Sequence, residues 1–310
     1  MRRAPSQPQG SEPTRTEAGR LSRLVPWALR AVWAALPLAA GPRLAVALDP
    51  RSPAVRSVAS VGLWAGWAVV MVATLVPHPR ALTTVRTGVA AGAAAVGGAI
   101  VSHPRPVAGV IVAILAVVAA VGLAFSAPLG MAFVNGPAYP NERRFPLRPP
   151  GPLLLGPLML AWAVAVGAPT ATALLMAVER WALGAAVGTL GLPAAAVMAR
   201  SLHGLSRRWI VFVPAGLVLH DPLSVIDPVL FRRQTIEALR PAPLGSDSLD
   251  LSHGAPGLAL ELVLREKVPM VVVRPGRRGD QPGASARLLF TPTRPGLVLS
   301  EARARRLPVG

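Results

Sequence analysis

Long stretches without a charged residue constrain this chain more than any other feature. Residues 57–76, 106–127, 152–178 and 181–199 contain no charged side chain, and residues 81–102 contain only Arg86. A helix needs about 20 mostly apolar residues to cross roughly 30 Å of hydrocarbon. Charged residues make up 15% of the 310, well below the roughly 25% of a soluble domain. The pattern predicts an integral membrane protein with five clear spans.

A sixth candidate span covers residues 24–41 and is less apolar. It contains Arg30 and two prolines, while Trp27 and Trp33 are residues that suit a membrane–water interface. The alternative is an amphipathic helix that lies on the membrane surface.

The distribution of arginine decides between five and six spans, because cytoplasmic loops of membrane proteins are enriched in Lys and Arg. Six spans with both termini cytoplasmic place 12 arginines inside and 4 outside, whereas five spans with a cytoplasmic N-terminus give 9 and 7. The predicted spans are about 24–41, 57–76, 81–102, 106–127, 152–172 and 178–199. Together they form a transmembrane domain at 23–200 in the cell membrane.

The first 22 residues are polar and aperiodic, so residues 1–22 are predicted to be a disordered cytoplasmic tail. The loop at residues 128–151 contains turn-forming prolines and three arginines, Arg143, Arg144 and Arg148. These arginines are candidates for binding an anionic lipid headgroup on the cytoplasmic side. The simpler alternative, which we prefer, is a basic stop-transfer loop in which Glu142 pairs with a neighbouring arginine.

The sequence pattern changes after residue 200, from long uncharged runs to short β-rich segments. Strands are predicted at residues 208–213 and 217–220, in 229–239, in a hairpin of 258–264 with 268–273, and at 286–291; a helix follows at 297–307. Residues 207–310 therefore form a small antiparallel β domain with a C-terminal helix. The fold class is a membrane α-helical bundle of five or six spans followed by this domain.

Two segments carry a resemblance to a known family. Residues 208–220 open with a strand, a glycine turn and a second strand, and residues 231–239 contain a strand with an inward-facing Ile236. This order resembles the bacterial pleckstrin-homology-like domains that follow transmembrane helices, and the whole chain resembles multi-span membrane proteins of actinobacteria. The resemblance implies a module for partner binding or assembly rather than catalysis.

No motif for chemistry accompanies this architecture. The chain has no cysteine, and its five histidines do not have the spacing of metal ligands. No nucleophile elbow, phosphate-binding glycine loop or dinucleotide fingerprint occurs in the sequence. We therefore expect no enzyme activity, no cofactor and no catalytic or metal-binding residue.

The net charge of +18 comes almost entirely from arginines that flank apolar runs. The chain lacks the aromatic and basic platform that single-stranded nucleic acids require, so we expect no nucleic-acid binding. The predicted partners are membrane lipids and a membrane or cytoplasmic protein. The predicted function is that of a scaffold or assembly factor, and the alternative is a small transporter or channel subunit. The candidate contact residues are Arg143, Arg144, Arg148, Arg207, Arg208, Arg232 and Arg233.

Overall fold

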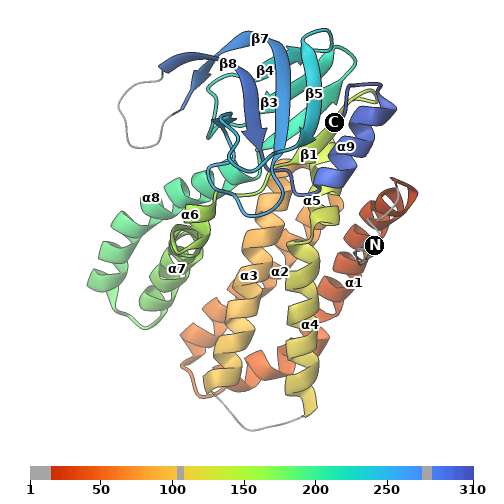
Figure 1. The fold of residues 1–310 in the computed structure, drawn as a ribbon. Coiled ribbons are helices and arrows are strands. Elements are labelled where there is room, and N and C mark those ends of the chain that lie inside the picture. Colours follow the sequence, from red (N-terminus) through yellow and green to blue (C-terminus); the bar gives the residue numbers. More distant parts are fainter. Residues whose placement is uncertain (1–14, 103–107, 274–280) are drawn as a thin grey trace, which may run out of the picture.

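The computed structural model describes residues 15–102, 108–273 and 281–310. It shows a bundle of apolar helices below a unit of two small sheets (Figure 1). The helices of the bundle are α1 (Arg15–Leu48), α2 (Pro53–Leu75), α3 (Pro79–Ser102), α4 (Ala108–Ala124), α5 (Ala127–Asn135), α6 (Gly151–Leu154), α7 (Pro157–Ala177) and α8 (Trp181–Leu205). Five of them (α1 from Arg23 onward, α2, α3, α7 and α8) are long and apolar enough to cross a membrane.

The structure modifies two predictions about the helices. Helix α1 begins at Arg15, so the predicted tail at 1–22 is helical in its last residues, and residues 1–14 lie outside the described part. The predicted span at 106–127 corresponds to α4, which ends at Ala124 and is followed by α5 after a bend of 51°. Ser126 fixes this bend, because its hydroxyl donates to the Leu123 carbonyl (2.7 Å) and accepts from the Leu129 amide (3.3 Å). The pair counts as a sixth span only when its two parts are taken together.

The helix predicted least clearly, α1, is held in the bundle by two tryptophans. The Trp33 indole donates to the Trp67 carbonyl of α2 (3.0 Å), and the Trp67 indole donates to the Trp33 carbonyl (2.8 Å). Pro37 has no N–H, which leaves the Trp33 carbonyl without its usual partner four residues later. The Trp67 indole replaces that partner. Trp33 is only 3% exposed, so its side chain packs inside the helical bundle.

The sheet unit contains two four-stranded sheets and a terminal helix. The strands are β1 (Arg143–Pro146), β2 (Trp209–Val213), β3 (Gly216–His220), β4 (Val229–Arg232), β5 (Ile236–Pro241), β6 (Leu249–Asp250), β7 (Leu260–Val272) and β8 (Gln281–Phe290), and helix α9 (Pro295–Ala304) follows them. One sheet has the order β1-β2-β3-β4 and the other β5-β7-β8-β6. All pairs are antiparallel except β6 with β8. The predicted small antiparallel sheet region with a C-terminal helix is therefore confirmed.

Strand β2 explains how the sheet unit and the helices meet. Ile210 and Phe212 point into the core between the two sheets. Trp209 and Val211 point the other way and join the apolar core of the helical bundle, which includes Phe133 of α5. Since β2 is buried on both faces, its sequence is apolar throughout and does not alternate.

The sheet unit begins earlier in the chain than predicted. Strand β1 comes from the loop at 128–151 and pairs with β2 along its whole length, from Arg143 opposite Phe212 to Pro146 opposite Trp209. The sheets are thus not confined to residues 207–310, because β1 belongs to the first sheet. Helices α6, α7 and α8 lie between β1 and β2 in the chain. The predicted hairpin turn at 265–267 is also wrong. These residues lie within β7, which continues to Val272 with a register shift against β8.

Candidate functional site

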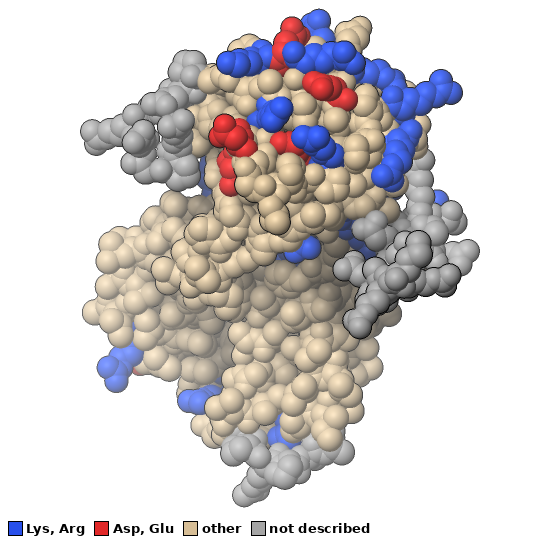
Figure 2. Space-filling model, in the orientation of Figure 1, with Lys and Arg blue, Asp and Glu red and all other residues tan. Residues whose placement is uncertain are grey.

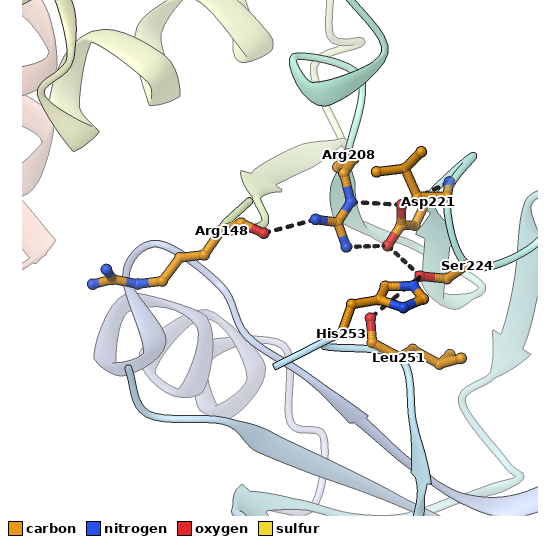
Figure 3. Close-up of polar contacts among 7 residues, drawn as sticks. Arg148, Arg208, Asp221, Ser224, Leu251 and His253 are labelled. Atoms are coloured by element: carbon orange, nitrogen blue, oxygen red, sulfur yellow. Dashed lines mark hydrogen bonds and ion pairs between the residues drawn. The ribbon is translucent and has the colours of Figure 1, made fainter. Parts of the chain in front are cut away.

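A buried ion pair lies where the two sheets meet (Figure 3). The Arg208 guanidinium donates to both carboxylate oxygens of Asp221, with Nε–Oδ1 and Nη2–Oδ2 distances of 2.7 Å. The side chains are 1% and 0% exposed. Arg208 Nη1 also donates to the Arg148 carbonyl (2.8 Å) that follows β1. The pair therefore ties β1, β2 and the end of β3 together.

Ser224 and His253 extend this network toward the second sheet. The Ser224 hydroxyl lies 2.6 Å from Asp221 Oδ2, 3.2 Å from the Leu251 carbonyl and 2.9 Å from His253 Nε2. Burial and the charge of Arg208 lower the pKa of His253, although Asp221 opposes the shift, so the imidazole is neutral at pH 7.

This arrangement contains the residue types of a hydrolase triad in the wrong order. In a triad the imidazole lies between the carboxylate and the serine and removes the serine proton. Here the serine lies between the carboxylate and the imidazole, and the carboxylate is already neutralised by a guanidinium. The network joins backbone segments of both sheets and lacks the carboxylate–imidazole–serine order of that triad.

A second buried carboxylate anchors the proline-rich loop after β5. Glu261 of β7 is 1% exposed and accepts from Ser246 (2.7 Å), Ser248 (2.6 Å) and Arg240 (2.8 Å). Burial raises the pKa of the Glu261 carboxyl, but the hydrogen bonds from Ser248, Ser246 and Arg240 outweigh that effect and lower it to about 2. Glu261 is therefore a charged structural anchor. Among the described residues, no group of three or more histidines and acids could hold a metal ion.

The junction between sheet and helices contains the most distinctive open site. A cavity of about 250 Å³ is lined by Glu142, Arg144, Trp209, Val211, Val213, Val218, His220 and Pro228. It lies on the face of the β1–β4 sheet that is turned toward the helices, because its apolar lining belongs to or packs against the bundle core. We call it the junction cavity.

Two aromatic contacts order the wall of the junction cavity. The His220 ring stacks on Trp209 with centroids 4.9 Å apart, and the Arg144 guanidinium lies 5.7 Å from the Trp209 ring centroid. Arg144 also pairs with Glu142 at 3.1 Å, which is the pairing expected for the stop-transfer loop. Burial lowers the pKa of His220, and the charges of Arg207 and Arg144 lower it further, against the opposing effect of Asp221.

Two arginines within the apolar helices, Arg30 and Arg86, cap the ends of neighbouring helices. Arg30 of α1 donates through Nε and Nη2 to the Thr74 carbonyl in the last turn of α2 (3.1 and 2.7 Å). Arg86 of α3 donates to the carbonyl of Ala124, the last residue of α4 (3.3 Å). Carbonyls in the last turn of a helix have no partner within that helix. Each arginine thus supplies a donor where the backbone lacks one.

The structure separates the seven candidate contact residues. Arg144 lines the junction cavity, and Arg207 acts electrostatically on His220 beside it. Arg208 is buried in the ion pair with Asp221, so it cannot contact a headgroup, and its assignment as a contact residue is corrected.

The remaining four candidates lie elsewhere. Arg143 opposes Phe212 in the β1–β2 ladder, and its Nε is buried without a hydrogen-bond partner in the described part of the chain, as is that of Arg148. Arg232 and Arg233 are exposed at the end of β4 that pairs with Gly216. This is the opposite end of the strands from Trp209. Arg233 Nη2 donates to the Arg305 carbonyl after α9.

The sequence alone did not identify Trp209 and His220 as parts of a site. The available signal was the unbroken apolar run of β2, which indicates burial on both faces and therefore an interface. Comparison of the chain with protein-family models, with curated proteins and with solved structures finds no match. The proposal for its function therefore rests on the geometry of the structure.

Proposed function

We propose that the protein is inserted in the cell membrane through six crossings, with α4 and α5 together forming one of them. The sheet unit and the N-terminus then lie on the cytoplasmic side. Figure 1 supports this orientation, since the start of α1, the α2–α3 turn and the end of α8 all lie at the sheet end of the bundle. Arg23, Arg80, Arg200 and Arg207 belong to these segments. The opposite end includes the α7–α8 turn, where Glu179 and Arg180 are both exposed.

We further propose that the protein is a scaffold or assembly factor, which presents its sheet unit to a protein partner. The observation that carries this proposal is the burial of β2 on both faces, because it fixes the sheet unit on the bundle. The sheet β5-β7-β8-β6, which we call the outer sheet, carries the exposed side chains Glu237, Arg265, Lys267 and Arg287. Figure 2 shows charged side chains gathered over the sheet unit and few on the visible flank of the helices.

The resemblance to pleckstrin-homology-like domains rests on antiparallel strands followed by one helix, and the order of elements in the sheet unit supports the proposal. A β1–β4 meander is followed by β5, β7 and β8 and then by α9, with the α7–α8 hairpin inserted between the first two strands. We infer from this order that the sheet unit acts as a partner-binding module.

A transporter or channel subunit is the second candidate, and the broken helix α4–α5 favours it. Broken helices that end near a charged group form the substrate sites of many transporters. Here Arg86 meets the break at Ala124. The capping of a backbone carbonyl accounts for this arginine equally well, so we rank the scaffold first.

The test is site-specific photo-crosslinking in intact cells. A photoreactive residue at Glu237 is expected to give a discrete adduct, whereas one at the buried position Leu262 of β7 gives none. Reversing the charges of Arg265 and Lys267 should weaken the Glu237 adduct and leave membrane insertion unchanged. An adduct of equal yield after this reversal would reject the scaffold proposal. The absence of an adduct, together with solute uptake in proteoliposomes, would reject it in favour of transport. Reporter fusions after residues 22 and 310 test the orientation separately.

A further inference from the structure

We infer that the junction cavity binds the phosphate group of an anionic phospholipid, through Arg144 and His220. This inference rests on the proposed membrane insertion, because a lipid reaches the cavity only if the helices below it lie in a bilayer. It assigns a ligand class to a site distinct from the outer sheet that we propose for the protein partner.

Arg144 is held in place before any ligand arrives. Asn135, the last residue of α5, accepts from the Arg144 amide (2.9 Å) and donates to the Arg144 carbonyl (2.8 Å). The guanidinium is then fixed between Trp209 and Glu142. Arginine is well suited to phosphate, since its planar fork matches two oxygens at once. A preorganised guanidinium loses little conformational freedom on binding.

His220 supplies a second donor on the same wall. Its Nε2 atom is buried and has no hydrogen-bond partner among the residues that the structure describes. A buried polar atom without a partner destabilises the structure, because it has lost its hydrogen bonds to water. A rotation of the imidazole that brings Nε2–H to the cavity surface lets a phosphate oxygen accept from it, and this contact removes that destabilising effect. The stacked Trp209 ring keeps the imidazole on the cavity wall.

The rest of the lining distinguishes a lipid from a free phosphate. Val211, Val213 and Val218 form an apolar side of the cavity, next to the core of the helical bundle. A volume of about 250 Å³ is equivalent to roughly eight waters at ~30 Å³ each, which accommodates a phosphate with its glycerol. The phosphate then meets Arg144 and His220, while the carbon atoms meet the valines.

Glu142 modulates the site. Its carboxylate pairs with Arg144 and therefore competes with a phosphate for the same guanidinium. Replacing it by glutamine removes a negative charge from the cavity wall without changing its size. We therefore expect Glu142→Gln to bind anionic lipid more tightly than the wild type.

The test is native mass spectrometry of the full chain from mixed micelles of phosphatidylglycerol and phosphatidylcholine. The wild type should retain phosphatidylglycerol in preference, and Arg144→Gln should reduce its retention about tenfold or more, as expected for a hydrogen bond to a charged group. Arg232→Gln, at the opposite end of the strands, is the matched control and should retain the lipid. His220→Gln keeps an N–H donor and should bind better than His220→Leu.

Several results would overturn the inference. Equal losses in Arg144→Gln and Arg232→Gln would mean diffuse attraction rather than a site. If an equal concentration of inorganic phosphate displaces the bound phosphatidylglycerol, the ligand of the junction cavity is a soluble phosphate and not a lipid. A weaker affinity of Glu142→Gln would contradict the competition. If reporter fusions show the chain inserted while no lipid preference exists, this inference fails and the proposed function stands.

Discussion

The buried ion pair between Arg208 and Asp221 gives a quantitative test of the sheet unit. The Asp221 carboxylate accepts two bonds from Arg208 at 2.7 Å, one from the Leu223 amide at 3.1 Å and one from Ser224 at 2.6 Å. In Asp221→Asn, either orientation of the amide turns N–H groups toward two of these donors. The Arg208 charge is also left buried without a counter-charge. Breaking such a pair costs about 3–5 kcal/mol.

This loss converts into a large change of melting temperature. For a domain of about 100 residues, each 1 kcal/mol shifts the midpoint by roughly 4–8 °C. The sheet unit of Asp221→Asn should therefore melt at least about 12 °C below the wild type. The measurement is thermal unfolding of the detergent-solubilised full chain, followed through the β signal in circular dichroism.

Two further variants make the reasoning refutable. Glu142→Gln breaks the partly exposed pair with Arg144, with side chains 18% and 24% exposed, and should cost no more than about 1 kcal/mol. The double variant Arg208→Met with Asp221→Leu replaces the ion pair by apolar groups and should recover most of the loss. A melting temperature of Asp221→Asn close to that of Glu142→Gln would refute the large cost of breaking this ion pair. A double variant no more stable than Asp221→Asn would refute it as well.

Three other predictions test separate features. Because the folded protein lowers the pKa of Glu261, the charged carboxylate stabilises the fold fully at pH values above the ordinary pKa of 4.5, and this contribution is lost as the pH falls toward about 2. Glu261→Gln should therefore reduce the acid sensitivity of unfolding between these two pH values. Trp67→Phe removes the donor to the carbonyl freed by a proline in α1 and should lower stability by about 1 kcal/mol, whereas Trp64→Phe, at an exposed position of the same helix, should be neutral in the same melting assay. Gly136→Ala places a methyl group against the backbone carbonyl of Pro77 and should reduce the yield of folded protein, while Gly97→Ala, in open space, should not.

The helical part of the fold follows from the sequence because long uncharged runs of about 20 residues favour apolar helices long enough to cross a membrane. The departures arise where a polar group finds a partner that is distant in sequence. Arg30 and Pro37 weakened the prediction of the first span. In the structure the Arg30 guanidinium donates to the Thr74 carbonyl, and the Trp67 indole replaces the hydrogen bond that Pro37 cannot make. Ser126 fixes the bend after Ala124 locally, but the Ala124 carbonyl at that bend accepts from Arg86, which lies on another helix. No local pattern contains these pairings.

The sheet unit shows the same limit. Strands β2 and β3 and helix α9 were predicted from β-rich or helical patterns with their turns. Strand β1 was missed because its four residues (Arg143–Pro146) carry two charges and a proline, and only the pairing with β2 makes them a strand. The junction cavity was missed for that reason, since Arg144 reaches Trp209 and His220 only after β1 pairs with β2.

The separation of β1 from β2 has a consequence for biosynthesis. About 60 residues, including the α7–α8 hairpin, lie between the two strands. At roughly 5–20 residues per second, β1 leaves the ribosome several seconds before its partner. During that time its backbone groups are an open edge that other chains can pair with. In the membrane orientation that we propose, α7 and α8 enter the bilayer between the synthesis of β1 and β2, so a delay in inserting this hairpin prolongs the exposure of that edge. Under that proposal the first sheet is completed only after the last two helices are inserted, and chains in which insertion fails carry an unpaired strand that proteases and chaperones can recognise.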